Sequence, residues 1–172
     1  MVISANYGGA TMNADLDKIV DESINMEINT SKLYDIFRDS HTEDYKFWQQ
    51  LAQEERNHAS LIDGARSAFL KIGKFPKQLV APSEHELIAV NDRLDSLISQ
   101  FKISTPTRVE SFNIALEIEN SAGEFHYQSA METPSESVFL RVFQEINKGE
   151  KDHICRIRAY MQENRIECKV AI

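Results

Sequence analysis

The sequence predicts an all-α protein made of two antiparallel helical hairpins, joined by a long connection that holds a further short helix. Helix-forming residues dominate, and apolar residues recur at spacings of three and four. All four prolines fall in short stretches between these periodic segments. The 172 residues suit a single domain, 1–172, because a chain of this length can bury a substantial core.

The first hairpin is expected to contain a helix over residues 13–39 and a second helix that ends at Gly73. Between them, Ser40 and Glu43 have the spacing of a capping box, in which each side chain bonds the other residue's backbone N–H. A link this short makes the two helices antiparallel neighbours.

The long connection, residues 73–106, contains the shorter helix, which Ser83 and Glu86 open as a second capping box. A third long helix is expected from near Pro106 to about Met131, because proline is favoured at a first helical position.

The fourth long helix is expected to reach about Glu163, with Thr133 as its cap, Pro134 at its first position and Glu136 at its third. The tail, residues 165–172, packs either on this bundle or on a neighbouring chain, and the sequence leaves both open.

Composition excludes several classes of partner. The net charge is -8 and no basic cluster stands out, which argues against binding to nucleic acid or to an anionic membrane. No apolar run is long enough to span a membrane and no secretion signal is evident, so we expect a cytoplasmic protein. Cys155 and Cys168 make no disulfide framework, and we expect Cys155 to be a small buried side chain on a helix.

One motif occurs twice. Glu55 and His58 stand three residues apart, as do Glu150 and His153, and residues three apart share one face of a helix. The segments "MEINTSKLY" and "IENSAGEFH" then align without a gap, which pairs Glu27 with Glu119 and indicates an internal repeat of a helical hairpin.

Metal coordination explains why these glutamate and histidine residues would face one another in a bundle core. Four antiparallel helices would bring the motifs to one level of the bundle core, where four carboxylates need compensation for their buried charge. Two divalent cations would neutralise them, and mixed carboxylate and imidazole ligands suit iron or manganese. The candidate metal ligands are Glu27, Glu55, His58, Glu119, Glu150 and His153.

The set matches the pattern of ferritin-like di-iron carboxylate bundles, and "AQEERNHASLI" and "ALEIENSAGEFHY" most resemble the rubrerythrin group. The resemblance implies a ferritin-like four-helix bundle that reduces hydrogen peroxide or dioxygen at a di-iron centre, a role in oxidative stress. It further implies that Glu55 and Glu150 bridge the metals and that Glu27 and Glu119 are terminal or chelating ligands. His58 and His153 would each hold one iron, and Tyr34 would place a hydroxyl near the cluster.

Departures from that group affect the expected partners. The chain has no rubredoxin segment with four cysteines, so electrons would come from an external donor such as a rubredoxin-like protein, and we expect a homodimer. Leu116 replaces an additional glutamate of the group. His126 stands where the repeat predicts a tyrosine, and is a proton relay, an added ligand, a group beside the ligands or a core histidine.

The alternative function is that of a ferroxidase or iron-binding protein of bacterioferritin type, in iron storage or detoxification. Arg56 occupies the place of the haem-binding methionine of that family, so no haem is expected. Glu54 and Glu124 are expected on the solvated surface. For Glu54, the alternative is a contact with His153 across the bundle. His41 and His85, near helix starts, are expected to be exposed.

Overall fold

The computed structural model describes residues 7–146 and 153–169. Within these ranges the protein is all-α, with seven α-helices and no strand. The helices are α1 (Tyr7–Ser40), α2 (Tyr45–Ala65), α3 (Glu84–Phe101), α4 (Arg108–Glu119), α5 (Ala122–Glu132), α6 (Val138–Ile146) and α7 (His153–Glu163). Three short helical turns accompany them: η1 (Thr42–Asp44), η2 (Arg66–Leu70) and η3 (Lys77–Leu79). The predicted fold class is confirmed to this extent.

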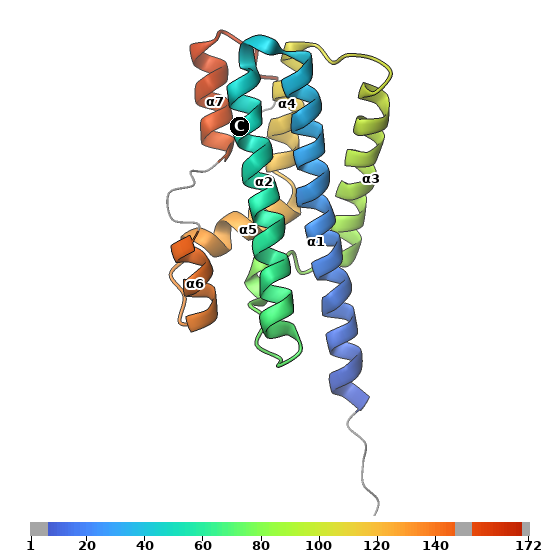
Figure 1. The fold of residues 1–172 in the computed structure, drawn as a ribbon, viewed down its shortest axis with the longest axis vertical. Coiled ribbons are helices and arrows are strands. Elements are labelled where there is room, and N and C mark those ends of the chain that lie inside the picture. The colour runs from blue at the N-terminus through green and yellow to red at the C-terminus, as the bar shows by residue number, and fades with distance from the viewer. Residues whose placement is uncertain (1–6, 147–152, 170–172) are drawn as a thin grey trace, which may run out of the picture.

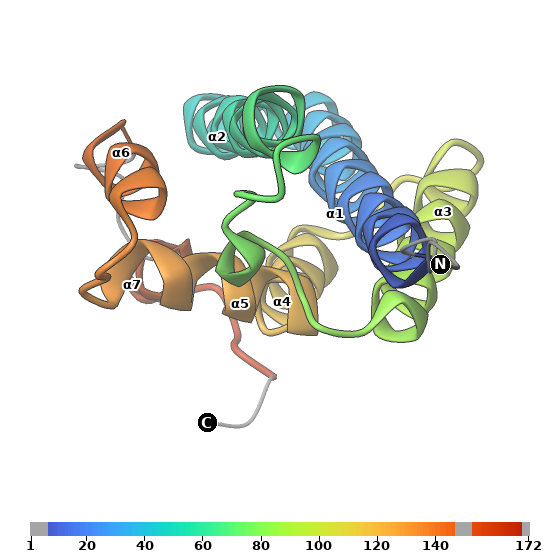
Figure 2. The same cartoon turned by 90° about the horizontal axis from the view of Figure 1, so that it is seen from below.

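The long helices α1 and α2 form an antiparallel hairpin along the length of the molecule (Figure 1). Seen from below, this pair lies opposite α4 and α7, and α3 packs on the outer side of α1 (Figure 2). Helix α5 turns across the bundle below α4, and α6 lies beside it. The predicted connecting helix is therefore α3.

Two of the predicted helix ends are observed and one is wrong. Ser83 accepts the backbone N–H of Glu86 at 3.3 Å, and Gly73 ends its segment in the left-handed conformation with φ 66°. Ser40, however, is the last residue of α1 and caps no helix. The N–H of His41 still bonds the carbonyl of Phe37 at 3.0 Å, so the helical pattern runs past the expected cap.

The third long helix is interrupted, contrary to the sequence prediction, and the described part of the fourth begins later than predicted. Helix α4 starts after Thr107, which forms a capping box with Glu110, and stops at Glu119. The Asn120 carboxamide donates to the carbonyl of Leu116 at 2.6 Å, a local bond that competes with helix continuation. The chain then turns before α5 begins.

In the fourth segment, α6 begins at Val138, five residues later than the predicted cap at Thr133. The Ser137 hydroxyl accepts the N–H of Leu140 at 3.3 Å and takes the capping role. Residues 147–152, which include Glu150, lie outside the described ranges.

Two apolar clusters fill the interior, and α1 and α2 contribute to both. Leu33 and Leu51 belong to the first cluster, in which the Trp48 and Phe112 rings lie 4.5 Å apart. Val20 and Ile62 belong to the second. On α2 the buried side chains between the two clusters include Glu54, Glu55 and His58, and on α1 the buried Glu27 lies between Val20 and Leu33.

The upper end of the bundle is held by a buried carboxylate. Asp44 of η1 accepts two hydrogen bonds from the Arg108 guanidinium, at 2.7 and 2.6 Å, and one from the Tyr160 hydroxyl at 2.9 Å. These bonds tie the α1–α2 connection to α4 and α7. They therefore fix the register between the two halves of the bundle.

The described tail residues pack on their own chain. Asn113 of α4 donates to the carbonyl of Glu167 at 2.8 Å and accepts the N–H of Lys169 at 2.5 Å. Of the two alternatives that the sequence left open, this part of the tail therefore packs on the bundle of its own chain.

Three expectations about single residues can be checked. Cys155 is exposed on α7, so its expected burial is wrong. His41 is buried, with its Nε2 2.9 Å from the Ser111 hydroxyl, so its expected exposure is also wrong. His85 is exposed, as predicted.

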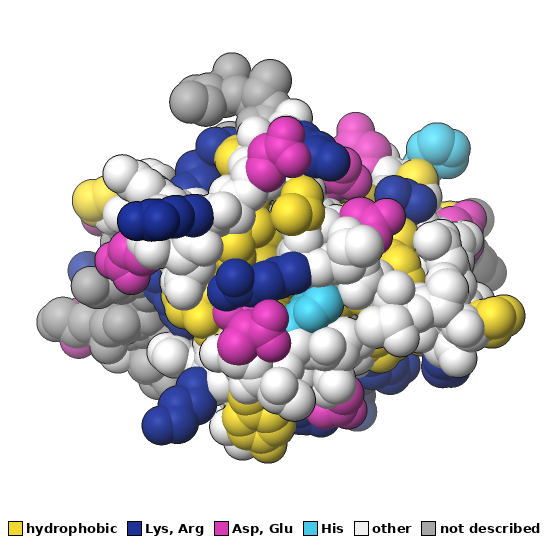
Figure 3. Space-filling model, turned by 90° about the horizontal axis from the view of Figure 1, so that it is seen from above, with side chains coloured by type: hydrophobic (Ala, Val, Ile, Leu, Met, Phe, Trp, Pro, Cys, Tyr) yellow, Lys and Arg dark blue, Asp and Glu magenta, His cyan; other side chains and the backbone are white. Residues whose placement is uncertain are grey.

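Charged side chains of both signs are interspersed over the upper end of the molecule (Figure 3). None of the described helices combines the length and the apolar character that a membrane span requires.

Replacing Asp44 with alanine is expected to lower the free energy of unfolding by roughly 1–3 kcal/mol, because the arginine and tyrosine donors would lose a buried acceptor. The control is Glu117→Ala, whose carboxylate is half exposed and lies 3.8 Å from Arg93, with an expected change within about 0.5 kcal/mol. Urea denaturation measures both, and equal losses would contradict the proposed role of Asp44.

Candidate metal centre

A buried layer of glutamate and histidine side chains lies between the two apolar clusters. Glu27 comes from the middle of α1, and Glu55 and His58 come from adjoining turns of α2. Glu119 ends α4 and His153 begins α7. Each of these five residues is at most 3% exposed. The fold therefore collects five of the six predicted ligands from four helices.

The carboxylate of Glu55 lies between two imidazoles. Its Oε2 is 3.0 Å from Nδ1 of His58, and its Oε1 is 3.0 Å from Nδ1 of His153. Neighbouring ligand atoms of a cation with bonds of about 2.1 Å lie at about this separation. The geometry thus suits a carboxylate that bridges two cations, with one imidazole at each.

A second carboxylate approaches each imidazole. Glu27 Oε2 lies 3.5 Å from Nδ1 of His58, and Glu119 Oε1 lies 3.2 Å from Nδ1 of His153. The Tyr34 hydroxyl donates to the same oxygen of Glu119 at 2.6 Å. Tyr34 therefore lies beside the cluster, where the resemblance to rubrerythrins put a hydroxyl.

Glu124 joins the cluster, although the sequence prediction put it on the surface. It is fully buried, and its carboxylate is grouped with ligand atoms of Glu27, Glu55 and His58, all within 4.8 Å of one another. In an unbroken helix Glu124 would face away from Glu119. The turn between α4 and α5 redirects it inward.

A sequence signal for this turn exists. The segment "NSAG", directly after Glu119, consists mostly of residues that favour helix ends over helix interiors. The presence of a helix break could have been predicted from it, but the new direction of the chain could not.

Glu54 is also buried, so its expected exposure is wrong and the alternative contact with His153 is confirmed. Its Oε2 lies 3.2 Å from Nε2 of His153 and accepts a hydrogen bond of 2.6 Å from Arg156. Gln50 donates to its other oxygen at 3.0 Å. A carboxylate on the outer nitrogen holds the imidazole with Nδ1 toward the centre, as carboxylates commonly do for metal-binding histidines.

Burial sets the protonation of these carboxyls. It raises the pKa of Glu27 to about 8 and raises the pKa of Glu124 well above its ordinary value. Burial also acts to raise the pKa of Glu55, but the charges of His153 and His58 outweigh it and lower that pKa. Burial acts on Glu54 in the same direction, yet its contacts with His153 and Arg156 lower its pKa to about 2.

The cluster fits a pair of metal ions. Among the described residues, neither oxygen of Glu27 or of Glu124 has a hydrogen-bond partner, although all four atoms are buried. Unpaired buried carboxylates are costly, and cations bound between them would remove that cost. Within the described ranges, two groups of ligand atoms lie close enough to hold a cation, and Glu55 is common to both: Glu27, Glu55, His58 and Glu124, and Glu55, Glu119 and His153.

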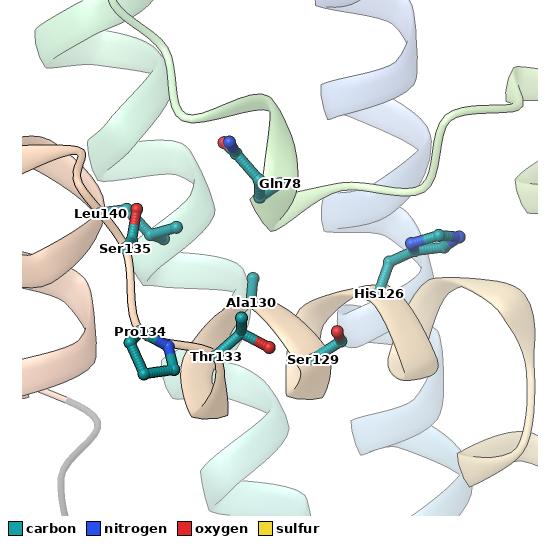
Figure 4. A pocket seen from close by; sticks show the side chains of 8 residues that line it. All are labelled: Gln78, His126, Ser129, Ala130, Thr133, Pro134, Ser135 and Leu140. Carbon is teal, nitrogen blue, oxygen red and sulfur yellow. The ribbon is translucent and has the colours of Figure 1, made fainter.

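His126 lies away from these two groups. It lines a surface cavity together with Gln78 of η3 and Ser129 and Thr133 at the end of α5 (Figure 4). Its side chain is partly buried. The structure therefore gives no support to its being an added ligand.

Comparisons with protein-family models, with curated proteins and with solved structures found no match to this chain. The fold and the centre thus carry the functional argument by themselves.

The metal-free protein is expected to lose stability as the pH rises from 5 to 8. Glu27 binds its proton more tightly when folded, with a pKa of about 8 against an ordinary 4.5. The stabilisation of the folded state by this tighter proton binding is complete below about pH 4.5 and is lost as the pH approaches 8. Thermal unfolding of metal-free Glu27→Gln should show a weaker pH dependence in this window, and an unchanged dependence would contradict the prediction.

Proposed function

We propose that the protein is a di-metal oxidoreductase of rubrerythrin type, which uses two iron ions to reduce hydrogen peroxide or dioxygen. The observation that carries the proposal is the position of Glu55, whose two oxygens each lie 3.0 Å from a different imidazole Nδ1. Glu27 and Glu119 flank this bridge, and Glu150 remains a predicted sixth ligand. Manganese or a mixed centre would accept the same ligands.

Bound iron would supply the electrons, and the protein's own residues would supply the surroundings. Reduction of one hydrogen peroxide molecule to two waters takes two electrons and two protons. The Tyr34 hydroxyl oxygen lies 2.6 Å from Oε1 of Glu119 and keeps its proton, because burial raises the pKa of Tyr34 well above the ordinary value. Glu54 and Arg156 keep His153 oriented, and the apolar clusters above and below exclude bulk water.

The electrons must come from outside the chain. The two cysteines cannot form the four-cysteine site of a rubredoxin, so a separate donor of rubredoxin type would reduce the centre. A homodimer is the proposed assembly, and the location is proposed to be the cytoplasm.

A ferroxidase is the second candidate, in which iron is the substrate and passes to a store or a partner. A surface cavity that reaches Glu119 favours it, because such a function requires ions to enter and leave. The assembly separates the two functions, since storage requires a large hollow shell and the oxidoreductase does not.

Metal analysis tests the centre itself. Protein purified without oxygen and loaded with ferrous iron is expected to hold two irons per chain, and Glu55→Gln is expected to lose most of this iron because the bridge connects both positions. The matched control is Glu117→Gln on the exposed face of α4, which should retain both irons. Equal iron content in the two variants would overturn the proposed centre.

Stopped-flow absorption spectroscopy tests the reaction. The ferrous-loaded protein is mixed separately with hydrogen peroxide and with dioxygen, and oxidation by peroxide is expected to be the faster. If dioxygen reacts as fast or faster, the peroxidase function is wrong. Catalytic oxidation of many ferrous ions per chain would instead favour the ferroxidase.

A further inference from the structure

A cavity of about 310 Å³ lies at the surface beside the candidate metal centre, and Glu119 is among the residues that line it. It is bounded by the end of α4, by α5 and by the first turn of α7, and it exists where the third predicted helix is interrupted. Glu119 contributes to its lining from within the buried layer, and Glu132 at the end of α5 is exposed. Its other lining residues are Asn120, Gln128, Ser129, Thr133 and Ile154.

The chemistry of this lining favours cations. Two carboxylates are accompanied by two carboxamides and two hydroxyls, and no lysine or arginine is among the described lining residues. The cavity next to Glu54 differs, because Arg38, Lys46 and Arg56 line it. A cleft with one sign of charge raises the local concentration of ions of the opposite sign.

Glu119 joins this cavity to the centre. Its Oε1 lies 3.2 Å from Nδ1 of His153, so an ion that reaches Glu119 is already beside the second group of ligand atoms. Glu27, Glu55 and Glu124 line none of the described cavities that we find at the surface. Glu119 thus belongs both to the lining of this cavity and to the second group of ligand atoms.

We propose that this cavity, here called the α5–α7 inlet, is the route by which divalent cations reach the centre. The inference rests on the proposed metal site. Glu132 attracts the ion at the rim, and Glu119 receives it. The ion then occupies the position of Glu55, Glu119 and His153, and from there it passes to the position formed by Glu27, Glu55, His58 and Glu124.

The first test blocks the inlet with a bulky side chain. Gln128→Trp is compared with Gln78→Trp, which introduces the same side chain beside two neighbouring cavities but not in the inlet. Co²⁺ is mixed with metal-free protein in a stopped-flow instrument, and its visible absorption reports the rate of binding. Gln128→Trp should bind about tenfold more slowly than the wild type and Gln78→Trp at the wild-type rate, with equilibrium affinities within about twofold because no ligand changes.

The second test reverses a charge. Glu132→Lys is compared with Glu163→Lys, an exposed position at the far end of α7 that gives the same change in net charge. Binding of Co²⁺ to Glu132→Lys should be several-fold slower at low salt, and the difference should shrink as the ionic strength rises. Equal rates in these two variants would contradict attraction at the rim.

The outcomes separate the inlet from the metal site. If Co²⁺ binding is lost in Glu55→Gln and yet Gln128→Trp binds as fast as the wild type, the inlet is wrong and the proposed centre stands. If Co²⁺ binding is not reduced in Glu55→Gln, both proposals fail.

Discussion

The burial of several carboxyl groups in one polar layer governs this structure. Glu27, Glu55, Glu119 and Glu124 are almost completely removed from water, between two apolar clusters that offer no compensation. A charged carboxylate in such a place costs several kcal/mol unless it is paired or protonated. Histidines compensate Glu55, while the oxygens of Glu27 and Glu124 have no hydrogen-bond partner within the part of the chain that the structure describes. Cations bound in this layer would remove the cost of burying these carboxylates.

The interruption of the third helix after Glu119 has two consequences that a continuous helix would not have. It turns Glu124 inward, which adds a carboxylate to the layer, and it opens a polar cavity that ends at Glu119. Helix breaks cost backbone hydrogen bonds, which the N–H of Ser121 recovers in part by bonding the carbonyl of Ile118 at 2.8 Å. The irregular backbone thus lies where the proposed chemistry needs both ligands and access.

The surrounding fold is suited to hold these groups rigidly. Asp44 ties the α1–α2 connection to α4 and α7, and the Trp48 ring of α2 packs on the Phe112 ring of α4. Near the centre, the Glu54 carboxylate accepts a hydrogen bond from Arg156 and lies 3.2 Å from Nε2 of His153. Such contacts restrict the rotamers of the ligands, which lowers the cost of ordering them when an ion binds.

The sequence alone determined the helical class, the α1–α2 hairpin and the spacing that puts Glu55 and His58 on one face, because these depend on local periodicity. It also paired Glu27 with Glu119 through the repeat. Only the tertiary structure decided that Glu124 and Glu54 turn inward, that His41 is buried and that Cys155 is exposed. The burial of Glu54 and His41 and the exposure of Cys155 depend on which helices lie opposite them, and the position of Glu124 depends on the direction that the chain takes after α4. Residues distant in the sequence set that direction, so no local pattern encodes it.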